Sequence, residues 1–380
     1  MNHDFIITAT RSMRTYAARV VDRFYQFPGS AADPERLNGI GCLTVERFAD
    51  GEMEVVVKDS IRGRDAVLFA GCSRNEAGIG VEEAKIELYH TIDAMKRAKA
   101  NAVILFEPYV SCSRSDRAAR RSSVGLWVHL KTAASLGASH YITYQLHSDK
   151  SKSLLDPAQC AIDDVPALTL LKKHLCDAYV QDLETLEQAV RPHWAFCSVD
   201  AGGEKLARDF ANSFSAPLVV AHKQRNYAAA NRVESVNILT AEPLEGKVLW
   251  IVDDMVDTGA SIVTLINSLQ ERRPAEINIL AVHAVLSSPA AERLARLVQE
   301  NLLNRFIVTD SICCPQSLLR EVPNLEVVSS TGLSAAIINA LAANASMSGL
   351  FQPFNAAEYL RGRRSPGPPV ASPLVPAILG

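Results

Sequence analysis

A run of acidic, hydroxyl and small residues at positions 253–261 carries the side chains best suited to chemistry. Two adjacent carboxylates are followed, after two apolar residues, by a short turn sequence: Asp253, Asp254, Asp257, Thr258, Gly259, Ala260 and Ser261. An apolar run, 248–252, precedes them and an amphipathic run follows. This order predicts a buried strand, a tight turn and the start of a helix.

The start of that helix is suited to bind phosphate. Its first N–H groups are free and its dipole is positive there. Gly259 and Ala260 let an anion approach the backbone, and the hydroxyls of Thr258 and Ser261 add donors. Carboxylates at the strand end accept hydrogen bonds from the vicinal hydroxyls of a sugar. The run therefore predicts a sugar-phosphate site at a strand tip, where open α/β sheets bind ligands.

The run has two other possible interpretations. The simpler one is a capped helix with Asp257 or Thr258 as the N-cap. The other is the acidic, Mg²⁺-binding strand end of a nucleotide triphosphatase. That class also needs the phosphate loop G-x-x-x-x-G-K-[ST], which the sequence lacks. The two acids combined with the small-residue turn favour the sugar-phosphate site.

The elements that must position this run alternate along the chain. Near-continuous apolar runs, typical of strands covered on both faces, occur at 66–70, 102–106, 141–146, 194–198, 217–221, 248–252 and 277–285. Amphipathic runs between them predict helices at 81–98, 124–136, 204–214 and 260–272. The alternation indicates an α/β fold with mainly parallel sheets flanked by helices.

Two such units fit 380 residues. We expect one unit at 1–165 and another at 166–335, with the turn-rich segment 156–166 as the crossover. Segment 336–352 is a candidate to pack back on the first unit. The end of the chain, 353–380, is rich in Pro, Ala, Gly and Arg and predicts a disordered tail.

The composition excludes several classes of protein. Apolar residues make up 48% and the net charge is −3, which describes a globular protein and argues against nucleic acid as a partner. No apolar run is long enough to span a bilayer, and the N-terminus is a poor signal peptide. The eight cysteines lack metal-type C-x-x-C spacing. We therefore expect a reduced, cytoplasmic protein that binds no membrane.

The run at 253–261 resembles the phosphoribosyl-pyrophosphate fingerprint of type I phosphoribosyltransferases and phosphoribosyl pyrophosphate synthetases. Transferases are shorter, single-domain proteins, so the length favours the synthetases. Further stretches are similar to synthetase blocks and occur in that family's order: FADGE at 48–52 with SIRG at 60–63, PYVSCSRSDR at 108–117, GASHYITYQLH at 137–147, SVDAGG at 198–203 and HKQR at 222–225.

The resemblance implies a fold and a reaction. The fold is two phosphoribosyltransferase-type α/β domains, assembled as a homo-oligomer that is hexameric or dimer-based. The reaction is that of ribose-phosphate diphosphokinases: the pyrophosphoryl group of Mg-ATP moves to the 1-hydroxyl of ribose 5-phosphate, which gives phosphoribosyl pyrophosphate and AMP for nucleotide biosynthesis. The implied cofactor is Mg²⁺.

The resemblance also assigns roles to residues. The catalytic cations are Lys223 and Arg225, which without this context would be read as an exposed basic pair. The ribose 5-phosphate site is the run Asp253, Asp254, Asp257, Thr258, Gly259, Ala260 and Ser261. The ATP-binding residues are Phe48, Asp50, Glu52, Arg114, Asp116 and His147, and the metal ligands are His147 and Asp200.

Other implied features involve a second subunit. The FADGE segment serves a neighbouring subunit's site in relatives, although by itself Asp50-Gly51 reads as a hairpin turn. A regulatory anion site between subunits matches Ser60, Arg62, Arg121, Ser346 and Ser348. Arg114, Arg117 and Arg121 would share one helix face if their segment is helical.

Three departures and two rival functions remain. Ser115 replaces a Gln of the family, Gln145 replaces an Asp next to the metal, and Val282-His283-Ala284 replaces a threonine-histidine-glycine block. A non-catalytic subunit that regulates a paralogue is one rival, but it should lack the catalytic cations or the paired acids, and this chain keeps both. A phosphoribosyltransferase is the other, and it would not need the N-terminal blocks.

Overall fold

The first half of the chain is built on a parallel sheet of five strands. This computed structural model describes residues 4–26, 33–118, 121–225 and 233–363, without the side chains of 223–225 and 233–235. The strand order is β1 (Phe5–Ala9), β4 (Asp65–Phe69), β5 (Ala102–Glu107), β6 (His140–Tyr144) and β7 (Ala161–Val165). Every residue of β1 and β4 is buried, as expected for strands covered on both faces.

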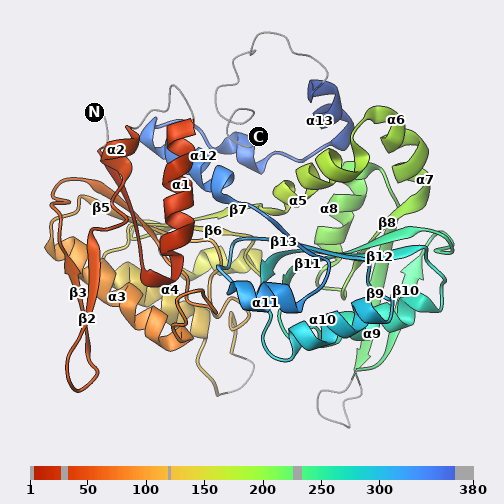
Figure 1. The fold of residues 1–380 in the computed structure, drawn as a ribbon, viewed down its shortest axis with the longest axis horizontal. Coiled ribbons are helices and arrows are strands. Elements are labelled where there is room, and N and C mark those ends of the chain that lie inside the picture. The colour runs from red at the N-terminus through yellow and green to blue at the C-terminus, as the bar shows by residue number, and fades with distance from the viewer. Residues whose placement is uncertain (1–3, 27–32, 119–120, 226–232, 364–380) are drawn as a thin grey trace.

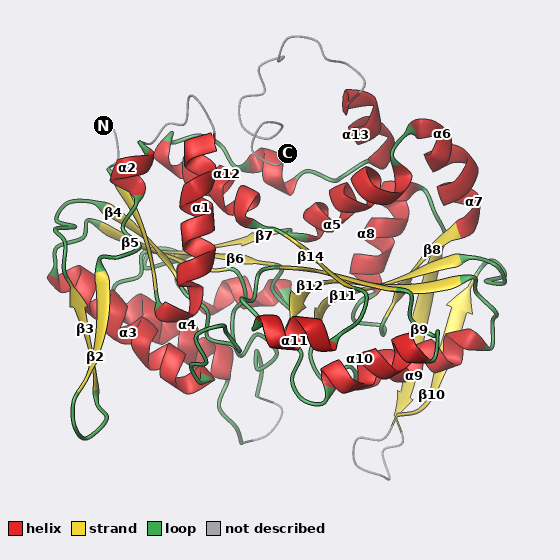
Figure 2. Ribbon diagram, viewed as in Figure 1, coloured by secondary structure: helices red, strands yellow, loops and turns green. Residues whose placement is uncertain are grey.

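A two-stranded antiparallel hairpin extends from this half (Figure 2). It consists of β2 (Leu43–Arg47) and β3 (Met53–Val57). In its turn, the N–H of Gly51 donates to the carbonyl of Phe48 at 2.9 Å, and Asp50 accepts from the N–H of Glu52 at 3.1 Å. Gly51 has a φ of 94°, which a residue with a side chain adopts only at a cost. The Asp-Gly pair therefore forms a hairpin turn.

The second half contains a larger, mainly parallel sheet of seven strands. Their order is β10 (Val233–Thr240), β9 (Leu218–Arg225), β8 (Trp194–Ser198), β11 (Val248–Val256), β12 (Glu276–Ala284), β13 (Arg305–Thr309) and β14 (Leu325–Val328). Only the edge pair, β10 with β9, is antiparallel. Val252 of β11 lies opposite Ser198 of β8, so the segments that follow these two strands meet at one edge.

Helices cover both faces of the two sheets (Figure 1). One side carries α3 (Val81–Arg97), α4 (Gly125–Leu136), α9 (Ala260–Gln270), α10 (Ala290–Gln299) and α11 (Gln316–Glu321). The other side carries α1 (Arg14–Gln26), α5 (Leu168–Leu175), α8 (Glu204–Phe214), α12 (Thr331–Ala342) and α13 (Ala356–Arg363). A single hydrophobic core on this second side runs from Phe69 and Phe106 in the first sheet to Trp250 and Phe196 in the second. The two halves are thus joined by shared packing.

The connection between the halves differs from the expected one. The segment 156–166, predicted as a crossover, contains β7, the last strand of the first sheet. The chain then crosses through α5, π-helical turns at Cys176–Val180 and Leu186–Val190, α6 (Leu183–Thr185) and α7 (Arg191–His193). β7 is a half-buried edge strand, so it tolerates the two acidic residues of its sequence AIDDV. Because of these residues, the segment lacks the apolar run by which seven of the other strands were predicted.

After the second sheet the chain returns to the first half. Helix α12 packs on α1, where the Tyr16 hydroxyl contacts the hydroxyls of Ser330 and Ser334, both at 2.8 Å. Residues 356–363 form α13, with Ala356, Ala357 and Leu360 buried, so the prediction of disorder is wrong for this part of the tail. Residues 364–380 lie outside the described part. Among the described residues, no helix is both long and apolar enough to cross a membrane.

Candidate active site

The turn between β11 and α9 has the predicted phosphate-binding geometry. Gly259 precedes the first helical residue with a φ of 72°, a left-handed conformation that glycine adopts at no steric cost. The carbonyl of Gly259 accepts from the N–H of Val263 at 3.0 Å, whereas the N–H groups of Ala260, Ser261 and Ile262 have no acceptor within the helix. These N–H groups point out of the N-terminal end of α9, where the helix dipole is positive, so they can donate to an anion.

The two acids before the turn have different environments. Asp253 accepts a hydrogen bond from the N–H of Asp254 at 3.0 Å, and Asp254 accepts one from His147 Nδ1 at 2.8 Å. Burial and the charge of Asp254 raise the pKa of Asp253 well above its usual range. Burial also opposes ionisation of Asp254, but the hydrogen bond with His147, the charge of that imidazole and the hydrogen bond with Asp253 together outweigh burial and lower the pKa of Asp254. The negative charge of the pair is therefore concentrated on Asp254.

His147 belongs to the other half of the molecule. It follows β6, and its imidazole is about half-buried against Asp254. The hydrogen bond with Asp254 raises the pKa of His147, although burial opposes this. The protonated imidazole and the ionised carboxylate thus stabilise each other where the two halves meet.

A second ion pair also joins the halves. Arg114, on the loop after β5, donates to Asp257 in the phosphate-binding turn. Burial alone would raise the pKa of Asp257, but hydrogen bonds at Ser287 and Arg114 hold it below its usual value. Arg114 is half-exposed, so this guanidinium is accessible to an incoming anion.

These groups line one cavity of about 660 Å³. Its walls come from both halves, and the residues predicted by sequence that line it are Arg114, His147, Asp200, Asp253, Asp254, Asp257, Thr258, Gly259, Ala260 and Ser261. Its volume is within the usual range for ligand sites. The whole predicted ribose 5-phosphate run is therefore brought together with part of the predicted ATP and metal set.

Asp200 enters this cavity from the loop after β8. Its Oδ1 accepts from the N–H of Gly202 at 2.9 Å and of Gly203 at 3.2 Å, which fixes the loop ahead of α8. Among the described residues, neither Asp200 nor His147 belongs to a set of three ligating groups within 4.8 Å of one another. The cavity therefore offers separate oxygen and nitrogen donors, not a closed protein cage.

The predicted catalytic cations are on β9. The backbone of Lys223 pairs with that of Val236, and Arg225 pairs with Val233, at the end of the β9–β10 ribbon. Their side chains lie outside the described part of the chain, so the prediction for them stays open. His222, directly before Lys223, lines the cavity, which brings the end of β9 to its wall.

Comparison with known proteins agrees with this arrangement. Residues 6–137 match the family model of the N-terminal domain of ribose phosphate pyrophosphokinase, and residues 177–302 match that of the phosphoribosyl transferase domain. A ribose-phosphate pyrophosphokinase of Bacillus caldolyticus is 30% identical over 278 residues, which span 73% of this chain and 80% of that protein. The chain belongs to the ribose-phosphate pyrophosphokinase family.

Other relatives support the same assignment. A ribose-phosphate pyrophosphokinase of Corynebacterium ammoniagenes is 30% identical over 279 residues, 73% of this chain and 80% of the relative. The crystal structure of phosphoribosylpyrophosphate synthetase from Mycobacterium smegmatis matches with a TM-score of 0.74 and 25% identity, over 90% of this chain and 99% of that one. The predicted α/β fold with phosphoribosyltransferase-type architecture is thereby confirmed.

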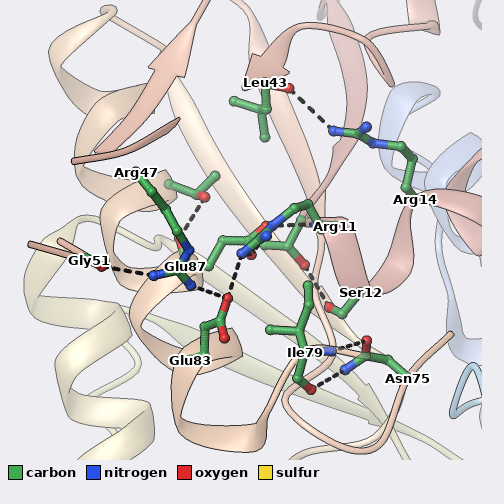
Figure 3. A network of polar contacts seen from close by, with 12 residues as sticks. Arg11, Ser12, Arg14, Leu43, Arg47, Gly51, Asn75, Ile79, Glu83 and Glu87 are labelled. Carbon is green, nitrogen blue, oxygen red and sulfur yellow. Dashed lines mark hydrogen bonds and ion pairs between the residues drawn. The ribbon is translucent and has the colours of Figure 1, made fainter. Parts of the chain in front are cut away.

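The FADGE segment, residues 48–52, forms the turn of the β2–β3 hairpin and does not reach the cavity of its own chain. Phe48, Asp50 and Glu52 are exposed, and none of them lines the cavity. Arg47 and Glu83 hold the hairpin against α3 (Figure 3): Arg47 donates to Glu83 and, at 2.8 Å, to the carbonyl of Gly51.

The same network fixes α3 to the start of the chain. The Arg11 guanidinium donates to Glu87 at 2.8 Å and to Glu83 at 3.0 Å, and the Arg11 N–H donates to Glu87 at 2.7 Å (Figure 3). Glu87 is buried, so these bonds supply the partners that a buried carboxylate requires. The hairpin therefore presents its turn on a well-anchored support.

The departures from the family pattern have local explanations. Ser115 accepts from the N–H of Gly125 at 3.0 Å and so holds the start of α4. None of the described residues between Ser111 and Val124 is helical, so Arg114, Arg117 and Arg121 do not share the predicted helix face. Of these three arginines, Arg114 and Arg117 line the cavity.

Gln145 and Asp116 are both neighbours of His147, the first along the chain and the second through its charge. Gln145 has a φ of 44° and lines a separate cavity of about 400 Å³, which His147 and Asp254 also border. Asp116 is half-buried and contributes to raising the pKa of His147, which places its charge near the imidazole, although it does not line the main cavity.

The predicted regulatory residues lie on separate surface segments. Ser60 and Arg62 follow β3, Arg121 precedes α4, and all three are exposed. Ser346 and Ser348 follow α12, where the Ser346 hydroxyl donates to Ser348 at 2.9 Å. Their role as an anion site stays a prediction.

His283, which sequence reasoning noted only as a departure, supports the segment that carries His147. Its Nε2–H donates to the carbonyls of Tyr144 and Gln145 at 3.1 and 3.2 Å, and its Nδ1 lies 2.9 Å from the hydroxyl of Ser311. Burial lowers the pKa of His283 to about 4, so the imidazole is neutral. It joins β12 to the segment that carries His147. A polar residue inside the apolar run INILAVHAV was the available signal.

Proposed function

We propose that this chain transfers the pyrophosphoryl group of Mg-ATP to the 1-hydroxyl of ribose 5-phosphate and produces phosphoribosyl pyrophosphate and AMP. The observation that carries this proposal is the cavity in which the β11–α9 turn and its paired acids face Arg114 and His147 from the other half. Membership of the ribose-phosphate pyrophosphokinase family supports the same reaction.

Ribose 5-phosphate is assigned to the β11–α9 turn. The 5-phosphate would accept from the N–H groups at the start of α9 and from the hydroxyls of Thr258 and Ser261. Asp253 and Asp254 would accept from the ring hydroxyls, and the ionised Asp254 is the stronger acceptor. The 1-hydroxyl would then face the half of the cavity that contains Arg114.

ATP is assigned to the opposite wall. Arg114 and Arg117 suit bidentate contact with phosphate oxygens. The 1-hydroxyl oxygen would attack the β-phosphorus, so that an O–P bond to ribose forms while the bond between the α–β bridging oxygen and the β-phosphorus breaks and AMP leaves. Lys223 and Arg225, at the end of β9 next to His222, would stabilise the charge on the transferring phosphates.

The donors in the cavity fit Mg²⁺. This ion prefers oxygen ligands, keeps several waters and is held partly by substrate phosphates. Asp200, with His147 as a further contact, would hold it, and a site without a preassembled three-ligand cage agrees with that mode of binding. The ion would supply neutralisation of phosphate charge.

The proposed assembly follows from the exposed hairpin. Because Phe48, Asp50 and Glu52 are exposed and away from their own cavity, we assign them to the adenine of a neighbouring copy's site. With this assignment, the active form is a homo-oligomer that is hexameric or dimer-based. We place this enzyme in the cytoplasm. An anion bound by Ser60, Arg62, Arg121, Ser346 and Ser348 would regulate it from a subunit boundary.

Phosphorus NMR of the protein with ribose 5-phosphate and Mg-ATP tests the reaction. AMP and phosphoribosyl pyrophosphate should appear together and in equal amounts. Formation of ADP would show a simple kinase, and binding of both substrates without turnover would show a non-catalytic subunit. Release of pyrophosphate from phosphoribosyl pyrophosphate only when a nucleobase is added would show a phosphoribosyltransferase.

A further inference from the structure

A buried group of three metal-binding side chains lies outside the cavity described above. The ligating atoms of Cys72, Glu107 and His129 are all within 4.8 Å of one another, and each residue is at most 1% exposed. Cys72 follows β4, Glu107 is the last residue of the adjacent parallel strand β5, and His129 is on α4, which covers this face of the sheet (Figure 1). None of the three lines the 660 Å³ cavity.

Neighbouring tyrosines orient two of the three side chains. The hydroxyl of Tyr89 is 2.9 Å from His129 Nδ1, which leaves Nε2 directed toward Glu107. The hydroxyl of Tyr141 donates to Glu107 Oε2. Metal-binding histidines are typically held in this way by a partner on the other ring nitrogen, and ligating carboxylates are themselves hydrogen-bonded.

A purely structural hydrogen-bond network explains only part of this group. His129 Nε2 is 2.7 Å from Glu107 Oε2, so the imidazole, the Tyr141 hydroxyl and one carboxylate oxygen are satisfied. Among the described residues, the other oxygen, Oε1, is buried and has no hydrogen-bond partner. A buried carboxylate oxygen left without a donor is unfavourable. With the Cys72 thiol beside the same carboxylate, this oxygen leaves a position that a cation would fill.

We propose that Cys72, Glu107 and His129 bind a Zn²⁺ ion. A thiolate, an imidazole and a carboxylate suit a borderline-soft ion such as Zn²⁺, whereas Mg²⁺ prefers oxygen ligands alone. Tetrahedral zinc bonds of about 2.0–2.3 Å place ligand atoms roughly 3.3–3.6 Å apart. In the structure His129 Nε2 and Glu107 Oε2 are 2.7 Å apart, and the ligating atoms of all three residues lie within 4.8 Å of one another. Zinc binding would therefore separate the imidazole and the carboxylate by about 0.6 Å and bring the thiolate to bonding distance by side-chain adjustment.

A route for the ion exists on the side of Cys72. This residue lines a second cavity, of about 720 Å³, together with Lys85, Tyr109 and Cys112. The cavity reaches the cluster at Cys72, whereas Glu107 and His129 do not line it. The site is independent of the reaction proposed above, but it has a structural link to it: Glu107 immediately precedes the loop that carries Arg114, so the ion would fix the start of that loop.

Zinc binding to the full-length protein tests the inference. The protein is purified without chelator and its metals are quantified by inductively coupled plasma mass spectrometry. It is then stripped and titrated with Zn²⁺ against a chromophoric chelator, with Mg²⁺ in excess so that oxygen-ligated positions are filled. We expect one tightly bound zinc per chain and, after Co²⁺ replacement, the visible bands of tetrahedral cobalt with thiolate-to-cobalt charge transfer.

Variants distinguish this site from others. Cys72→Ser and His129→Gln should each weaken zinc binding at least about 100-fold, and Tyr89→Phe should weaken it roughly 10-fold. Cys42→Ser is the matched control, because Cys42 is a buried thiol of the same core that donates to Thr8 at 3.3 Å, and it should bind zinc normally. Circular dichroism checks that each variant folds. If Cys72→Ser does not fold, the charge-transfer band of the cobalt-loaded unmodified protein decides the question.

Two results would overturn the inference. One is a stripped unmodified protein that takes up no zinc under these conditions, which would leave the cluster a hydrogen-bonded core. The other is zinc binding that is equal in the unmodified protein, Cys72→Ser and His129→Gln, or a cobalt spectrum without thiolate charge transfer, because the ion would then be bound elsewhere.

Discussion

In the candidate active site, two adjacent carboxyl groups have different pKa values because their surroundings differ. Asp253 and Asp254 are neighbours in sequence, yet the pKa of the first is raised and that of the second is lowered. The difference arises because only Asp254 has a hydrogen bond with His147. A pair with opposite shifts can present one ionised and one neutral carboxyl group to a sugar.

Asp254→Asn removes that charge while keeping the shape. Because hydrogen bonds to charged groups contribute about 1.5–3 kcal/mol, we expect ribose 5-phosphate affinity to fall roughly 10- to 100-fold. Isothermal titration calorimetry measures this directly. The control is Asp93→Asn, which removes a charge from an exposed i,i+4 pair on α3 and should bind normally. Unchanged affinity in Asp254→Asn would exclude Asp254 from the sugar site.

His283 makes the junction between the halves sensitive to acid. The unfolded chain takes up a proton near pH 6.5, whereas the folded chain does so only near pH 4. The unfolded state therefore binds more protons between these values, and the free energy of unfolding falls as the pH falls through this window. The loss between pH 7 and pH 5 should be roughly 2 kcal/mol.

Urea unfolding at pH 7 and pH 5 measures this loss. His283→Asn, which cannot titrate, should lose about 2 kcal/mol less than the unmodified protein over the same interval. His90→Asn, which replaces a histidine on the surface of α3, is the control. Equal losses in the unmodified protein and His283→Asn would contradict the buried, neutral imidazole.

At the scale of elements, α12 closes the fold by packing on the first half. The hydroxyl of Ser334 lies 2.8 Å from that of Tyr16 and 2.6 Å from that of Tyr144, and all three residues are fully buried. The serine thus joins α12 to α1 and to β6, and β6 leads directly to His147.

Ser334→Ala leaves the hydroxyl of Tyr144 without this partner inside the core. Because a buried polar group without a hydrogen bond costs about 1–3 kcal/mol, we expect the free energy of unfolding to fall by that amount. Urea denaturation measures the change. Ser213→Ala is the matched control, because its buried hydroxyl only bonds to the carbonyl of Asp209 within α8, and it should cost less. A loss in Ser334→Ala no larger than in Ser213→Ala would show that this link is dispensable.

At the scale of the whole molecule, the cavity exists only because the two halves are packed together. Arg114 and His147 come from the first half, Asp257 and Asp254 from the second, and both ion pairs cross between them. The exposed residues of the FADGE hairpin do not line this cavity, which is the basis for assigning them to a neighbouring copy.

Mixed oligomers test that assignment. At a ribose 5-phosphate concentration well below the KM of the unmodified protein, Phe48→Ala and Asp254→Asn should each have little activity alone. When the two are co-expressed, about a quarter of the sites would combine an intact hairpin from one subunit with an intact sugar site from another. Activity should recover to about that fraction in the AMP-forming assay. No recovery in an oligomer shown to contain both variants would place the hairpin and the sugar site in independent functions.

The sequence by itself determined the local features. Apolar runs predicted seven strands, and amphipathic runs predicted α3, α4, α8 and α9, because burial on both faces or on one face leaves a regular pattern. The β11–α9 turn was predictable down to Gly259, since a phosphate-binding turn requires small residues and free N–H groups in consecutive positions. The weaker patterns failed: β7 is an acidic edge strand, and α13 is a short helix in a region of tail-like composition.

Only the tertiary structure decided which distant side chains meet. His147 pairs with Asp254 across 107 residues, and Arg114 pairs with Asp257 across 143. Cys72, Glu107 and His129 have no recognisable spacing, and adjacent parallel strands with a covering helix bring them together. The reason is physical: strand and helix patterns record only whether a residue is buried, whereas contacts between elements depend on how whole layers pack.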